Sequence, residues 1–117
     1  MRTLAFALVL PLAACAGSAQ KQDLANAGKA RSLLAEASLI AEMAPRTSAT
    51  YTAQMRSAAL EELAALAATS RRAGGPDGQA IAALATVPAS ADAASLRGRA
   101  AHARAIEQRL EAGLEGS

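Results

Sequence analysis

The chain of 117 residues is poor in aromatic residues, with one Phe, one Tyr and no Trp. β-Branched aliphatic residues are also few, with three Ile and two Val. Because β-sandwiches and barrels draw on these residue types at alternating positions, the composition argues against both architectures. Proteins that stack nucleic-acid bases on aromatic side chains need several such rings. We therefore expect no nucleic-acid partner of that kind.

Cysteine and histidine occur once each, as Cys15 and His102. A single cysteine excludes an internal disulfide framework and a CxxC metal site, and a single histidine excludes a site with several His ligands. The formal net charge is only +2, so no strongly basic surface for a polyanion is expected. The sequence therefore predicts no metal and no bound cofactor.

Catalytic groups are equally scarce. His102 is predicted at the edge of an apolar helix face, where a surface or boundary position explains it without a role in catalysis. Glu61 and Glu62 are adjacent, so their side chains point about 100° apart on a helix and do not form a paired-carboxylate site. Asp77 lies in a glycine-rich turn that lacks the residues of a phosphate or calcium loop. We predict that the protein has no catalytic residues and is not an enzyme.

Alanine is abundant instead, at 35 of 117 residues. It has the highest helix propensity, but its small side chain contributes little to a core. Large apolar residues are sparse after residue 15, which predicts a thin core and a marginally stable fold.

The N-terminus has the organisation of a secretory signal peptide. Arg2 supplies a positive charge, and an uncharged apolar run extends from Leu4 to Ala14. This run has 11 residues, whereas a membrane-spanning helix needs about 20. The segment is therefore predicted to be removed in the mature protein.

The end of this segment, Leu12-Ala13-Ala14-Cys15, resembles the lipobox of bacterial lipoproteins at every position. The resemblance implies that the Cys15 thiol receives a diacylglyceryl group and that a lipoprotein signal peptidase cuts between Ala14 and Cys15. The covalent lipid would anchor the protein in the membrane. The alternative is ordinary cleavage between small residues, which would release a non-lipidated secreted or periplasmic helical binding protein.

The resemblance also bears on localisation and domain division. Aspartate after the lipidated cysteine retains enteric lipoproteins in the inner membrane, and Ala16 in that place implies the outer membrane, facing the periplasm. We expect a signal peptide over residues 1–14, a lipidated cysteine with a short flexible tether over residues 15–20, and an alanine-rich helical domain over residues 21–117.

Four helices are expected in the mature chain, over residues 19–43, 51–72, 78–86 and 91–112. Proline or glycine clusters separate them, and the predicted N-caps are Ser18, Ser48 or Thr50, Asp77, and Ser90 or Asp92. Three long helices and one short helix predict an all-α fold, a small antiparallel helical bundle that follows the cleaved signal peptide.

The most regular apolar stripe is Tyr51, Met55, Ala59, Leu63 and Leu66, spaced by four, four, four and three residues. We interpret it as part of the bundle core. The alternative is a face on which a partner helix docks, because a thin core can be completed by a partner or by a second copy. Tyr51, Met55, Leu63 and Leu66 are therefore the candidate partner-binding residues.

Together these features predict a membrane-anchored helical lipoprotein of the bacterial cell envelope, acting as a non-enzymatic adaptor or structural component. In size, helicity and lipidation it resembles the pilotins of secretion systems, although no pilotin motif is matched. The expected partners are the membrane, through the lipid on Cys15, and an envelope protein or further copies of the same chain.

Overall fold

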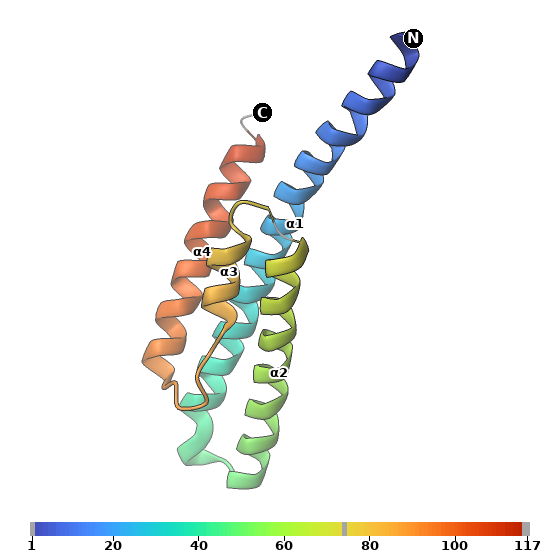
Figure 1. The fold of residues 1–117 in the computed structure, drawn as a ribbon. Coiled ribbons are helices and arrows are strands. Elements are labelled where there is room, and N and C mark those ends of the chain that lie inside the picture. The colour runs from blue at the N-terminus through green and yellow to red at the C-terminus, as the bar shows by residue number, and fades with distance from the viewer. Residues whose placement is uncertain (1, 74, 116–117) are drawn as a thin grey trace.

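The computed structural model describes residues 2–73 and 75–115, with side chains described for residues 18–72 and 75–115. Over these residues all the regular structure is helical, as predicted. In chain order the elements are α1 (Arg2–Met43), the short 3₁₀ helix η1 (Ala44–Arg46), α2 (Ala49–Ala73), α3 (Gly78–Ala85) and α4 (Ala93–Glu115) (Figure 1).

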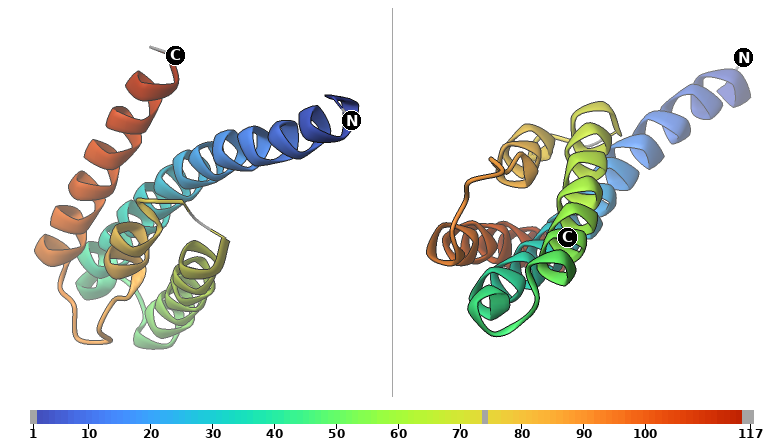
Figure 2. Two further views of the ribbon diagram at one scale, coloured as in Figure 1. Left: turned by 45° about the horizontal axis from the view of Figure 1, so that its top comes forward. Right: turned by 90° about the horizontal axis from the view of Figure 1, so that it is seen from below.

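The long helices run side by side along one axis, and α2 and α4 are antiparallel to α1 (Figures 1 and 2). The most extensive packing is between α1 and α4, followed by the packing of α2 on α1 and on α3. The short helix α3 covers only the half of the bundle nearer to the α2–α3 turn. The segment that follows it continues in the same direction to the other end of the bundle, where α4 begins (Figure 1). The antiparallel bundle of three long helices and one short helix is thereby confirmed.

Helix α1 begins earlier than predicted. It runs without interruption from Arg2, so the predicted N-cap at Ser18 is wrong for the uncleaved chain, and residues 16–20 are helical where a flexible tether was expected. The physical reason is that an alanine-rich segment extends a helix at little cost once the helix has nucleated. At its other end α1 stops at Met43, directly before a 3₁₀ turn that contains Pro45, as predicted.

Two of the predicted caps are confirmed. The Ser48 hydroxyl accepts a hydrogen bond from the backbone N–H of Tyr51 at 3.2 Å, at the start of α2. The Asp92 carboxylate accepts one from the backbone N–H of Ser95 at 2.8 Å, at the start of α4. Both satisfy backbone donors that have no partner inside their helix.

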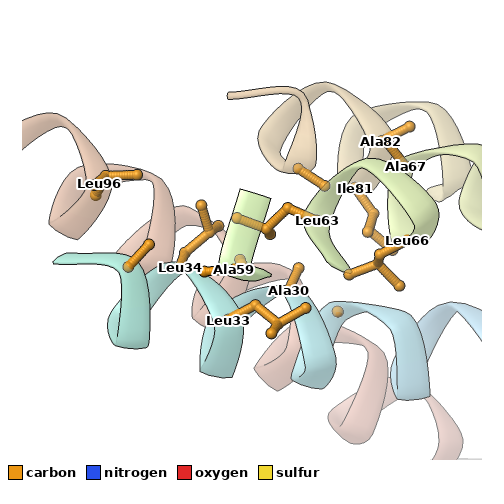
Figure 3. Packing of buried hydrophobic residues seen from close by; sticks show 14 of the residues in the cluster. Ala30, Leu33, Leu34, Ala59, Leu63, Leu66, Ala67, Ile81, Ala82 and Leu96 are labelled. Atoms are coloured by element: carbon orange, nitrogen blue, oxygen red, sulfur yellow. The ribbon is translucent and has the colours of Figure 1, made fainter. Parts of the chain in front are cut away.

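The core consists of small side chains with a few large ones between them (Figure 3). Nine of the fifteen buried hydrophobic residues are alanine, so the helices approach closely while each burying little apolar area. The six larger buried residues are Leu33, Leu34, Leu63, Leu66, Ile81 and Leu96. The predicted thin core is confirmed.

Two ion pairs join α1 to α4, and the pair between Arg31 and Glu107 is the less exposed of them. The Nε atom of Arg31 donates to Oε1 of Glu107 at 2.7 Å. This hydrogen bond, and then the charge of the carboxylate, raise the pKa of Arg31 above its usual value. Gly28 leaves room for the same carboxylate, because a Cβ atom there would lie 2.7 Å from Oε2 of Glu107.

Candidate functional site

The apolar stripe of α2 is divided between core and surface. Leu63 and Leu66 are buried in the centre of the bundle, which confirms their predicted core role and leaves them inaccessible to a partner in the folded chain. Met55 is half-buried. Tyr51 is 53% exposed, so its assignment to the core is wrong. The reason is the position of α3, which packs against the opposite end of α2 (Figure 1).

Large apolar side chains gather on the surface where α1 turns into α2. Leu39, Met43 and Tyr51 are 57%, 50% and 53% exposed, and no other described hydrophobic side chain of comparable size is as open. A hollow of about 70 Å³ lies beside Tyr51, lined by Ile40, Met43, Thr47, Tyr51, Thr52 and Met55. We call Leu39 together with these six lining residues the hairpin surface.

Two hydroxyl groups fix the backbone beneath the hairpin surface. Oγ1 of Thr47 donates to the carbonyl oxygen of Met43 at 3.1 Å and lies 2.7 Å from Oγ1 of Thr52. These contacts join the end of α1 to the first turn of α2. The hollow beside Tyr51 is therefore formed within the single chain by the turn between α1 and α2.

The hairpin surface is suited to binding an apolar partner. It offers thioether and aromatic groups, and its polar side-chain groups are the phenol of Tyr51 and two threonine hydroxyls that contact each other. Methionine side chains adapt to apolar partners of different shapes, and exposed apolar clusters mark interaction sites in many proteins.

The opposite end of the bundle contains a residue that sequence reasoning missed. Asp23 is fully buried on α1, and its carboxylate accepts hydrogen bonds from the backbone N–H groups of Gly75 at 2.7 Å and of Asp77 at 3.2 Å. It thereby attaches the α2–α3 turn to α1. The only signal in the sequence was an acidic residue at a helix position that faces the core.

Asp77 does not act as predicted. It occupies the N-cap position of α3, but its side chain makes no cap hydrogen bond. Its carboxylate instead accepts a hydrogen bond from Nη2 of Arg109 at 2.6 Å. The cap is lost because the carboxylate contacts α4, which the sequence pattern could not show.

The other titratable candidates lie on the surface of the bundle. His102, Glu61 and Glu62 are exposed, and none of them makes an ion pair in the described part of the chain. Among residues 2–73 and 75–115 no three His, Cys, Asp or Glu side chains are grouped as metal ligands. His102 lies beside an open hollow with Leu84 and Ile106, at the edge of the α4 stripe as predicted.

Three of the four arginines of α4 are engaged in contacts within the chain. Arg97 pairs with Glu42 on α1, Arg109 pairs with Asp77, and Arg99 donates to three carbonyl oxygens at the end of α3. These contacts connect α4 to its neighbours.

The predicted lipidation site lies in the first half of α1. The backbone of Ala14 and Cys15 is helical, and their side chains lie outside the described residues. The lipid attachment and the cleavage between Ala14 and Cys15 therefore stay predictions. In the part of the chain that the structure describes, no helix combines the length and the apolar character needed to cross a bilayer.

The function has to be argued from the residues of this chain alone. No family model, no curated protein and no solved structure matches it.

Proposed function

We propose that the protein is a lipid-anchored helical lipoprotein of the bacterial cell envelope that acts as a non-enzymatic adaptor or structural component. The observation that carries the proposal is the segment Leu12-Ala13-Ala14-Cys15, which ends a short apolar run with the sole cysteine of the chain. A thiol is an effective nucleophile for thioether formation, and small residues before it give a peptidase access to the backbone. Ala16 favours the outer membrane, facing the periplasm.

The arrangement of α1 supports an adaptor role. Cys15 and Met43 are 28 residues apart in one continuous helix, which corresponds to about 42 Å at 1.5 Å per residue. A lipid on Cys15 would therefore hold one end of the bundle at the membrane, with the hairpin surface at the other end. An anchored surface of this kind suits an envelope protein partner, as in the pilotins.

Lipidation is tested by metabolic labelling with an alkyne analogue of palmitate. We expect the wild-type protein to be labelled and to sediment with membranes, and the Cys15→Ser variant to be unlabelled. Ser32→Ala, an exposed substitution on α1, is the control and should behave as wild type. Equal labelling of wild type and Cys15→Ser would contradict the proposal.

The same experiment examines the alternative of a non-lipidated secreted or periplasmic binding protein. Ala14 and Ala16 flank Cys15 with small residues, as an ordinary signal peptidase site requires. In that case both proteins would be unlabelled and would remain in the fraction without membranes. A diacylglyceryl group has two acyl chains, and two such chains attach a protein stably to a membrane. A lipoprotein should therefore stay with membranes after washing.

A further inference from the structure

A second, larger cavity lies in the half of the bundle that contains the turn between α1 and α2. It has a volume of about 260 Å³, is partly open to solvent and is bordered by α1, α2, the start of α4 and the segment over residues 87–92. Because α3 ends at Ala85, no fourth helix fills this half, and only the segment that leads to α4 passes over it (Figures 1 and 2). The apolar wall consists of Ala37, Ile40, Ala41, Ala44, Leu60, Val87, Ala91, Ala93 and Leu96.

Arg56 lines this cavity as a half-buried cation. Its Nη2 atom donates to the carbonyl oxygens of Ala89 and Ala91, the second at 3.1 Å. Among the described residues no carboxylate pairs with Arg56, and its Nε and Nη1 atoms make no hydrogen bond. A partly desolvated guanidinium with unused donors favours an anionic oxygen as its partner.

Asp92 is the one acidic residue in the wall, and its carboxylate accepts the backbone N–H of Ser95 at the start of α4. Its negative charge disfavours an anion on that side of the cavity. An incoming anionic group is therefore directed to Arg56, and the apolar wall is left for the rest of the ligand.

We propose that this cavity binds a small amphiphilic carboxylate, with its carboxylate on Arg56 and its alkyl chain against the alanine-rich wall. The volume sets the size of the ligand. A water molecule occupies about 30 Å³ of the liquid, so 260 Å³ corresponds to about eight groups of that size, and hexanoate has eight heavy atoms. A dry apolar cavity of about 150 Å³ already holds benzene. This site does not depend on lipidation, and it adjoins the hairpin surface, with which it shares Ile40 and Thr52.

The isoleucines of the chain report on binding. Ile40 lines the cavity and also the hollow of the hairpin surface, whereas Ile81 is buried in the core and Ile106 lies on α4 outside both. Ala41 lines the cavity but not that hollow, so a substitution of Ala41 distinguishes the two places. We would label the δ1 methyl groups of the full-length protein in lipid nanodiscs and titrate it with hexanoate. We expect the Ile40 signal to shift saturably while the Ile81 and Ile106 signals stay in place. Shifts of all three signals, or no shift at Ile40, would overturn the proposal.

The charge requirement is tested by substitution and by ligand. Arg56→Gln should weaken hexanoate binding at least about tenfold, because a charge-assisted hydrogen bond is lost. Arg99→Gln is the matched control, since Arg99 also donates to backbone carbonyls but does not line the cavity. It should leave the affinity unchanged, and an equal loss in both variants would contradict a role for Arg56.

Two further measurements keep the test decisive if Arg56→Gln does not fold. The neutral analogue 1-hexanol should bind the wild-type protein at least about tenfold more weakly than hexanoate. Ala41→Leu should fill the cavity and abolish the Ile40 shift while the Ile81 signal stays at its native position. Binding of hexanol as tight as that of hexanoate, or an unchanged titration in Ala41→Leu, would refute the proposed site.

Discussion

Leu63 is one of the few large side chains that are completely buried in this bundle. Leu63→Ala should lower the free energy of unfolding by about 2–5 kcal/mol, since it removes apolar contacts and leaves a cavity. Leu63→Glu should be worse, because an unpaired carboxylate would be buried. Chemical denaturation followed by circular dichroism measures both effects.

Gln54→Glu provides the comparison for Leu63→Glu. Gln54 is exposed and lies on the other side of α2, so the new charge stays in water and stability should change by less than about 0.5 kcal/mol. If Leu63→Glu unfolded at the same denaturant concentration as Gln54→Glu, Leu63 could not be part of the core.

Asp23 shows at the residue scale what a pattern cannot predict. Its position on α1 faces the core, where an apolar residue is the usual choice. The carboxylate is stable there because two backbone N–H groups of the α2–α3 turn donate to it. Those donors lie more than fifty residues away in the chain, so no local rule relates them to Asp23.

At the scale of elements, the junction between α2 and α3 depends on a glycine. A Cβ atom on Gly78 would overlap the backbone carbonyl oxygen of Ser70 on α2. Gly78→Ala should therefore destabilise the protein by about 1–3 kcal/mol, because backbone has to move to relieve the overlap. The melting temperature measured by circular dichroism should fall.

Gly98 is the matched control within α4. A Cβ atom there would meet nothing within 4 Å, so Gly98→Ala should raise stability by about 0.5–1 kcal/mol through better helix propensity. Opposite shifts of the melting temperature are thus expected for the same substitution in two helices. A Gly78→Ala variant as stable as Gly98→Ala would show that α3 does not pack tightly on α2.

The positions of the helices were largely predictable because their breakers are strong. Pro45, the glycine-rich turn over residues 74–78 and Pro88 each interrupt the helical pattern, and the observed helices end beside them. The start of α1 was not predictable from the same rules. Pro11 and Gly17 are breakers before the first helix of the domain, yet the helix continues through both of them, because its other residues, many of them alanine, extend it.

At the scale of the whole molecule, the proposed adaptor role predicts a contact at the hairpin surface in cells. A photo-reactive phenylalanine in place of Tyr51 should give a discrete cross-linked product, because Tyr51 lies beside the hollow of that surface. Ser57 is exposed on the opposite side of α2 and serves as the control position. The products are detected by electrophoresis and identified by mass spectrometry.

The pattern of products separates the kinds of partner. A product at Tyr51 with another envelope protein supports the adaptor role, and a product between two copies of the chain indicates self-association. Equal yields from Tyr51 and Ser57, or no product at Tyr51, would contradict a docking role for the hairpin surface.

The sequence by itself determined the helical class, the number of helices and the thinness of the core. It also contains the whole argument for lipidation, because a lipobox is a local pattern of neighbouring residues. These properties follow from composition, from breakers and from the spacing of residues within one segment. None of them requires knowledge of which helices are neighbours.

Only the tertiary structure decided which apolar residues are covered. Helical periodicity placed Tyr51 and Leu63 on one stripe, yet Leu63 is buried and Tyr51 is exposed. The difference arises because α3 has only eight residues and packs at one end of α2. The same short helix leaves the cavity beside Arg56 unfilled. Burial depends on the length and path of neighbouring elements, and a periodic pattern within one helix contains no information about them.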